Sequence, residues 1–98
     1  MIVRIVKMTF RKREVNNFIQ VFENSKDKIR AFPGVQHLEL LQESEDKNIF
    51  FTYSIWESAV DLENYRCSTL FKETWAKTKP LFEKPAEAWS THQLHLLT

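Results

Sequence analysis

The chain has 98 residues, of which 43% are hydrophobic and 28% charged, and its 14 basic and 13 acidic side chains give a formal net charge of +1. These values predict a single globular domain over residues 1–98, because a chain of this length has no room for a second core. A charge so near zero argues against binding to nucleic acid or to an anionic membrane through bulk electrostatics.

The counts of rare residues exclude several kinds of site. The single cysteine, Cys67, rules out an intrachain disulfide and fits a reducing compartment. Arg4 and Lys7 interrupt the N-terminal apolar run, so it does not resemble a signal peptide, and no stretch approaches membrane-spanning length. One glycine cannot build a phosphate loop, and no metal-ligand spacing is visible. We therefore expect a cytoplasmic protein with no cofactor, no metal and no membrane partner.

The first half of the chain predicts a strand, a helix and a second strand. Residues 1–10 alternate and are rich in Ile, Val and Met, which is typical of a strand. Residues 14–32 carry apolar side chains near helical spacing, and the Pro33-Gly34 pair ends that helix in a turn. Residues 35–43 form the next predicted strand. Its alternation places Leu38 and Leu40 on one face, and on the other Val35, His37, Glu39 and Leu41.

The second half predicts a hairpin, a split helix and a last strand. A polar turn over 44–47 leads to a β-branched and aromatic strand over 48–56. Two short helices follow, one over 57–65 and one from 69 to about Pro80, and a last strand runs over 86–97. Ser58 can cap the first of these helices, and Ser68 or Thr69 the second.

This order predicts an α+β chain of the ferredoxin-like βαββαβ kind, with a four-stranded antiparallel sheet covered by helices on one face. The strand over 48–56 is apolar on both faces, with Phe51, Tyr53 and Ile55 on one and Phe50 and Trp56 on the other. An open sheet face normally shows polar residues. We therefore expect the face away from the helices to be buried in a twofold homodimer.

Four segments resemble the antibiotic biosynthesis monooxygenase family of dimeric α/β barrels. They are Phe32-Pro33-Gly34-Val35, Trp56-Glu57-Ser58, Leu62-Glu63-Asn64-Tyr65 and Leu70-Phe71-Lys72-Glu73. The resemblance covers essentially the whole chain and is strongest over 32–75. It implies a pocket between helices and sheet with Trp56 at its wall. It also implies either a cofactor-independent oxidation of quinols or polycyclic aromatics with O2 or, in another branch, haem degradation.

Two departures from the family pattern bear on the chemistry. The haem-degrading branch has a histidine where this chain has Trp75, and an asparagine where it has Val6 or Lys7. A tryptophan cannot ligate iron, so haem degradation is disfavoured. The missing histidine near Thr74 or Trp75 also weakens the quinol-oxygenase interpretation.

The candidate site residues are aromatic, with few polar groups. We expect the substrate-binding residues to be Trp56, Tyr65, Phe71 and Trp75, although aromatic residues at such positions are also typical of a plain core. The candidates for a catalytic role are Arg4, His37 and Tyr65. Arg4 could pair with an anion, His37 could share a proton with Glu39, and Tyr65 could donate a hydrogen bond.

Three functions remain open at this point. The first is a cofactor-independent monooxygenase acting on a small aromatic or quinol-type molecule with O2. The second is a non-catalytic dimeric module that binds a small hydrophobic ligand. RNA recognition ranks below both, because the chain lacks the Lys/Arg-Gly-aromatic signature although it shares the βαββαβ order.

Overall fold

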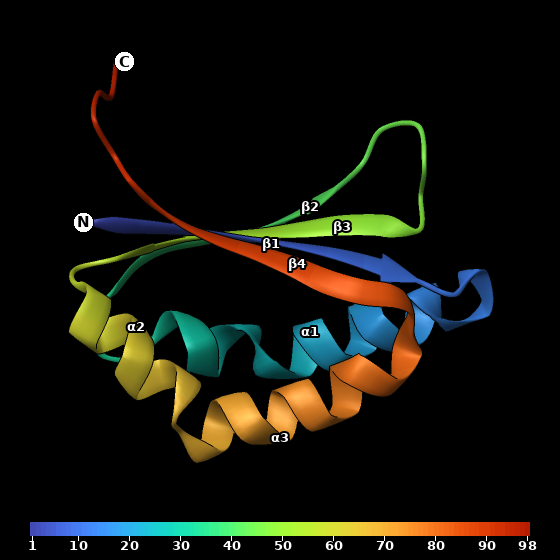
Figure 1. Cartoon of the computed structure of the whole chain (residues 1–98). Helices are drawn as coiled ribbons and strands as arrows, with labels where there is room; N and C mark the ends of the chain where they lie inside the picture. The colour runs from blue at the N-terminus through green and yellow to red at the C-terminus, as the bar shows by residue number, and fades with distance from the viewer.

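The computed structural model describes all 98 residues, and its three helices lie against one face of a four-stranded antiparallel sheet (Figure 1). The strands are β1 (Ile2–Phe10), β2 (Val35–Gln42), β3 (Ile49–Trp56) and β4 (Phe82–His92), in the order β2-β3-β1-β4. The helices are α1 (Val15–Arg30), α2 (Ala59–Arg66) and α3 (Thr69–Thr78), and short 3-10 turns lie at Lys12–Glu14 and Lys79–Leu81. The predicted ferredoxin-like α+β fold is confirmed.

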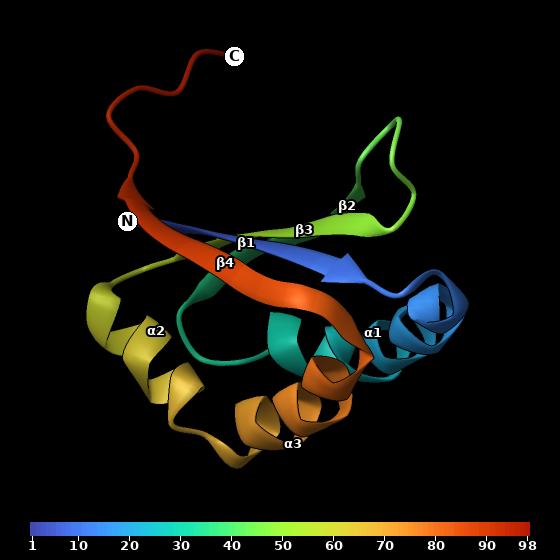
Figure 2. The same cartoon turned by 45° about the vertical axis from the view of Figure 1, so that its right-hand side comes forward.

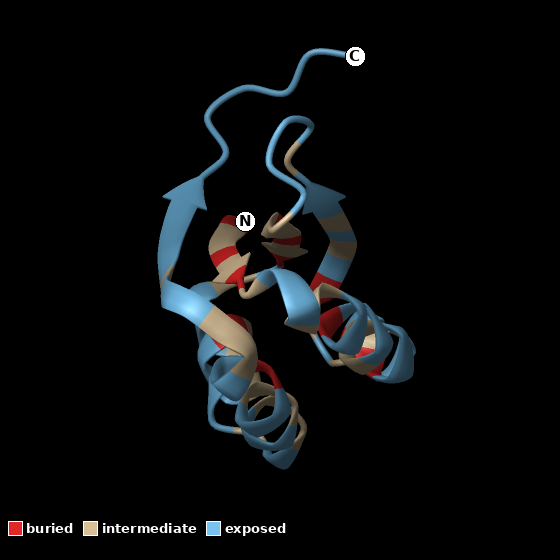
Figure 3. Cartoon of the chain, turned by 90° about the vertical axis from the view of Figure 1, so that its right-hand side faces the viewer, coloured by how far each residue is buried: buried red, intermediate tan, exposed pale blue.

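The helices occupy different parts of the covered face. Helices α1 and α3 run beneath the sheet, and α2 lies under the end where β3 finishes, as the two views in Figures 1 and 2 show. Buried positions gather between the sheet and these helices, whereas the segment after β4 is exposed (Figure 3). None of the helices combines the length and apolar character needed to cross a bilayer.

Serine caps explain why the second helix is split in two. The Ser58 hydroxyl accepts a hydrogen bond from the Asp61 backbone N–H at 3.2 Å, and the Ser68 hydroxyl accepts one from the Phe71 N–H at 3.1 Å. Each bond satisfies an amide that a helix start leaves free, which stabilises the helix by about 1 kcal/mol. The predicted caps are therefore confirmed.

The last strand begins and ends earlier than the sequence predicts. It starts at Phe82 rather than at residue 86 and stops at His92 rather than at residue 97. Pro85 lies inside it, where the register against β1 shifts between the pair Lys7 with Glu87 and the pair Thr9 with Lys84. A proline is tolerated at such an irregularity because β4 is an edge strand with only one neighbour.

A bulge also changes one predicted face of β2. Val35 pairs with Trp56, but the next pair is His37 with Ile55, so one extra residue separates them. The predicted placement of Val35 on the face of His37 is wrong. The bulge turns Val35 towards the helices, where it packs with Trp56 and Leu62.

The core consists of two separate clusters on the helix-facing side of the sheet. One lies at the start of β1 and the end of β3 and contains Ile2, Val35, Trp56 and Leu62. The other lies at the opposite end of β1 and contains Met8, Phe10, Phe18 and Phe50. The stacked rings of Phe10 and Phe18, with centroids 4.1 Å apart, join β1 to α1 in the second cluster.

The turn before β2 gives a test of this packing. Gly34 has a φ of +93°, and a Cβ added there would lie 2.4 Å from the Cβ of Asp61 in α2. Gly34→Ala should lower the free energy of unfolding by at least about 2 kcal/mol, because it adds backbone strain to a steric clash. Denaturant unfolding measures this loss.

Gly34→Asn separates the two causes. Asparagine tolerates positive φ but still carries a Cβ, so the clash predicts a loss comparable to that of alanine. If Gly34→Asn were as stable as the wild type, the close approach of α2 to this turn would be contradicted.

Candidate functional site

The pairing of β1 with β3 leaves space between the two core clusters. On the helix-facing side, the pairs run in order Ile2 with Trp56, Arg4 with Ser54, Val6 with Thr52, and Met8 with Phe50. Large apolar residues thus fill both ends, while the middle pairs carry small or polar side chains. A cavity of about 370 Å³ lies over this middle section, within the size range of small-molecule sites.

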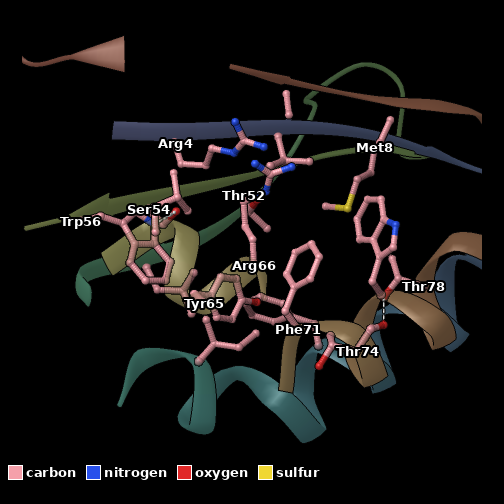
Figure 4. A pocket seen from close by; sticks show the side chains of 18 of the residues that line it. Arg4, Met8, Thr52, Ser54, Trp56, Tyr65, Arg66, Phe71, Thr74 and Thr78 are labelled. Atoms are coloured by element: carbon pink, nitrogen blue, oxygen red, sulfur yellow. Dashed lines mark hydrogen bonds between the residues drawn. The ribbon is translucent and has the colours of Figure 1, made fainter. Parts of the chain in front are cut away.

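The neighbouring strand and the helices complete the cavity. Strand β4 contributes only the small residues Ala86 and Ala88, and α1 contributes Phe18, Phe22 and Ile29. Figure 4 shows Arg66 of α2 and Phe71 of α3 pointing towards the sheet across this space. Thirteen of the 19 lining residues are hydrophobic, so the interior is mainly apolar.

A continuous row of aromatic rings forms one wall. Ring centroids are 5.0 Å apart between Trp56 and Tyr65, 5.2 Å between Tyr65 and Phe71, and 5.9 Å between Phe71 and the parallel ring of Trp75. The structure therefore brings together all four predicted substrate-binding residues, and each lines the cavity. Rings in this arrangement offer flat surfaces against which a planar molecule can stack.

Trp56 belongs to the core as well as to this wall. Its side chain is 1% exposed, and its indole N–H donates a hydrogen bond to the Ser54 hydroxyl at 3.0 Å. That bond leaves the indole without a free donor for a ligand. We infer that Trp56 supplies shape to the cavity, while the polar contacts come from other residues.

Tyr65 presents a free hydroxyl to the cavity. Its backbone carbonyl accepts a bond from Ser68, and its phenolic group has no partner in the chain. Burial raises the pKa of Tyr65 from its ordinary value to about 12. The phenol is therefore protonated at neutral pH and can donate a hydrogen bond to a ligand, but it cannot act as a base.

Arg4 is the polar residue on the sheet side. It points to the helix-covered face of β1, where its Nη1 donates a hydrogen bond to the Ser90 hydroxyl at 2.9 Å. Burial, followed by the charge of nearby Arg66, lowers the pKa of Arg4. Arg4 thus lines the cavity, and its catalytic role stays a prediction.

Arg66 is a site residue that the sequence analysis missed. It is the last residue of α2, and its guanidinium extends into the same part of the cavity as that of Arg4 (Figure 4). The sequence does contain a signal for Arg66. It lies four residues after Leu62 and directly after Tyr65, and residues four apart share a helix face. The hydroxyls of Thr52, Ser54, Thr74 and Thr78 also line the cavity and were not predicted.

His37 lies away from this site. It is on the opposite face of the sheet, beside Ile55 of β3, and its Nε2 lies 2.8 Å from an Oε1 of Glu39. The predicted pairing of His37 with Glu39 is therefore present, but neither side chain lines the cavity. A proton-transfer role for His37 in this cavity has no geometric support.

The titratable groups of the cavity limit its chemistry. Its lining contains Arg4, Tyr65 and Arg66 but no Asp, Glu, His, Lys or Cys. No group of three such acidic, histidine or cysteine side chains in the chain could hold a metal ion. The cavity can stack a planar molecule and donate hydrogen bonds, but it offers no side chain that accepts a proton at neutral pH.

Comparisons with known proteins place the fold. A family model described as "Antibiotic biosynthesis monooxygenase" matches residues 1–77. A search of curated proteins finds no match. Among solved structures, one described as an antibiotic biosynthesis monooxygenase superimposes with a TM-score of 0.91 at 12% identity, covering 97% of this chain and 100% of that chain.

Two further structures come from named organisms. Rv0793 from Mycobacterium tuberculosis has a TM-score of 0.90 at 15% identity and covers 99% of this chain and 98% of its own. A conserved protein from Methanosarcina mazei Go1 has a TM-score of 0.89 at 19% identity and covers 95% of this chain and 93% of its own. Similarity at these identities shows a shared fold.

The buried phenol predicts a dependence of stability on pH. Because the pKa of Tyr65 is raised to about 12, folding favours the protonated form. Its contribution is complete below the ordinary tyrosine pKa and is lost as the pH rises through the folded value. The wild type should therefore lose stability relative to Tyr65→Phe between about pH 10 and about pH 12. Denaturant unfolding of both proteins at several pH values measures the difference, and a constant difference would contradict it.

Proposed function

The chain belongs to the antibiotic biosynthesis monooxygenase family, and from this membership and the cavity we propose that it is a cofactor-independent monooxygenase. Its substrate is a small aromatic or quinol-type molecule, which it oxidises with O2. The observation that carries this proposal is the row of aromatic rings around a mainly apolar cavity of about 370 Å³. Such a cavity suits a planar, electron-rich substrate and keeps its reactive form away from water.

The reaction needs no electron source other than the substrate. A quinol with a hydrogen on one ring carbon reacts with one O2 to give a hydroxyquinone and one water. A carbon–oxygen bond forms at that ring carbon as its C–H bond and the O–O bond break. The ring C–H and the two O–H groups release three protons, of which one ends on the new hydroxyl and two leave with the second oxygen as water. The substrate supplies all four electrons that reduce O2, so the reaction balances without a further reductant.

The side chains have separate roles in this proposal. Phe71 and Trp75 of α3 hold the substrate ring, and Trp56 closes the end of the cavity at β3. Tyr65 donates a hydrogen bond to a substrate oxygen, since its hydroxyl is protonated and unpaired. The chain's own contribution is thus positioning, exclusion of water and hydrogen bonding.

A binding module without turnover is the second candidate. The same cavity would hold a small hydrophobic ligand, and the absence of a proton-accepting side chain in its lining favours this reading over an enzyme that needs its own base. The two functions share the same cavity and differ in whether O2 is consumed.

Oxygen uptake by the purified protein with a panel of quinols and polyphenols tests the enzyme proposal. Trp75→Ala should lower the uptake by about tenfold or more, because it removes the ring that positions the substrate. Trp75→Phe keeps an aromatic surface and should retain most of the activity. Ligand binding without uptake across the panel would contradict the enzyme and support the binding module.

The proposal includes a homodimer formed through the sheet face opposite the helices. That face carries Ile5 of β1 together with Phe51, Tyr53 and Ile55 of β3. At its edges, Leu41 is 45% exposed and Trp89 is 46% exposed. The pairs Lys7–Glu87 and His37–Glu39 also lie on this face. A cluster of apolar residues with polar pairs beside it is typical of a subunit interface. A second copy related by twofold symmetry would cover it.

Phe51→Glu tests the interface. A carboxylate in place of this aromatic ring should dissociate the dimer, because burying a charge in the interface is unfavourable and Lys7, its cross-strand neighbour, already pairs with Glu87. The sedimentation mass should fall from that of two chains to that of one. Val60→Glu is the matched control, since Val60 is 68% exposed on α2 and should leave the mass unchanged. An unchanged mass for Phe51→Glu would exclude this face as the interface.

A further inference from the structure

Two arginines extend into one part of an otherwise apolar cavity. Arg4 comes from the middle of β1, and Arg66 comes from the last turn of α2, on the opposite side of the cavity. Figure 4 shows the guanidinium group of Arg66 reaching up from α2 to the strands, beside that of Arg4. Burial, and after it the charge of Arg66, lowers the pKa of Arg4. Two like charges that face the same cavity repel each other.

The chain itself supplies little to offset this repulsion. Arg4 takes part in none of the ion pairs of the chain, and its one hydrogen bond goes to the neutral hydroxyl of Ser90. Arg66 has one acidic partner, Glu63, at 3.5 Å on the same helix. Both side chains of that pair are about half exposed or more, so water screens their attraction and the pair contributes little.

The rest of the cavity determines what kind of anion would fit. The lining apart from Arg4 and Arg66 contains no charged side chain, and its largest surface is the aromatic row from Trp56 to Trp75. A small inorganic anion would satisfy the arginines but leave the apolar part empty. A molecule with both a planar ring system and an acidic oxygen group would occupy both parts.

We propose that the cavity binds a planar aromatic molecule as its anion, with the ionised oxygen group seated between the guanidinium groups of Arg4 and Arg66. This anion site extends the proposed function. It depends on that function only for the statement that the bound anion is the substrate. The anion also accounts for the missing base. Because no lining side chain accepts a proton, the substrate has to be acidic enough to ionise on binding or to arrive ionised, and two cations favour that form.

Paired probes test the preference for an anion. Naphthalene-2-carboxylate and naphthalene-2-carboxamide have the same ring body, but only the first carries a charge. The carboxylate should bind about tenfold more tightly or better in a titration that follows tryptophan fluorescence, because charge-assisted hydrogen bonds exceed neutral ones. Equal affinities, or no binding of either probe, would overturn the proposal.

Arginine variants locate the effect. Arg4→Gln and Arg66→Gln should each weaken binding of the carboxylate by about tenfold and change that of the carboxamide by less than about twofold. Arg13→Gln is the control, since Arg13 is exposed and lies outside the cavity. Thermal unfolding shows whether each variant is folded, and Arg66, which is exposed, keeps the test valid if Arg4→Gln is unstable. If both variants fold and still prefer the carboxylate over the carboxamide, Arg4 and Arg66 do not form the anion site and the proposal is overturned.

A coloured acidic phenol distinguishes the two sources of the anion. The absorption of 4-nitro-1-naphthol reports its ionisation, which should occur at a lower pH when it is bound than when it is free. Where the naphthoate is preferred over the carboxamide, this shift supports a phenolate as the natural ligand, and its absence supports a carboxylate.

Oxygen uptake stays a separate measurement. If the protein prefers the anion but consumes no O2, the anion site stands and the monooxygenase activity is excluded. If it consumes O2 without preferring the anion, the activity stands and the anion site is excluded.

Discussion

The pairing of β1 with β3 determines where the cavity can lie. The two strands place large apolar pairs at both ends of the covered face, and these pairs belong to the two core clusters. The pairs between them, Arg4 with Ser54 and Val6 with Thr52, have too little apolar volume to meet the helices. Because the clusters fix the distance between sheet and helices at both ends, the middle section remains open. A register shift by one residue would turn all these side chains to the other face and remove the cavity.

Trp56 connects that register to the helices. It pairs with Ile2 and with Val35, and its ring contacts those of Phe32 and Tyr65. The N–H of the following residue, Glu57, donates a hydrogen bond to the carbonyl of Gly34 at 2.8 Å, which holds the end of β3 against the turn before β2. Trp56 therefore positions α2, and α2 in turn carries Tyr65 and Arg66 to the cavity. Trp56 therefore sets the geometry of the site from within the core, without a hydrogen bond to the ligand.

The sequence predicts the fold better than it predicts the site, for physical reasons. Alternation in β1 is sufficient to place Arg4 on the side of Val6 and Met8, and serine caps are local signals that depend on a few residues. The bulge after Val35 and the irregularity at Pro85 depend on pairing with distant strands, so periodicity alone could not locate them. The aromatic set could be named from its positions on separate elements together with the family resemblance, which implied Trp56 at a pocket wall. Whether those rings would enclose a space or fill it depends on the separation of sheet and helices, which no local pattern encodes.

Because local patterns do not encode contacts between distant elements, the sequence predicts a role for His37 and gives no sign of one for Arg66. A histidine two residues from a glutamate is visible in the sequence as a possible proton relay, but the pair lies at the surface of the other sheet face. Arg66 has no neighbour in the sequence that suggests a role. It matters because the fold brings it to the same cavity as Arg4, which is more than 60 residues away in the sequence. That juxtaposition also changes what kind of chemistry the cavity suits. With two cations, one neutral phenol and no base, the cavity stabilises negative charge on a ligand more readily than it removes a proton. Under the proposed monooxygenase function, the reactivity towards O2 would therefore lie in the ionised substrate, and the protein's contribution would be to favour that form.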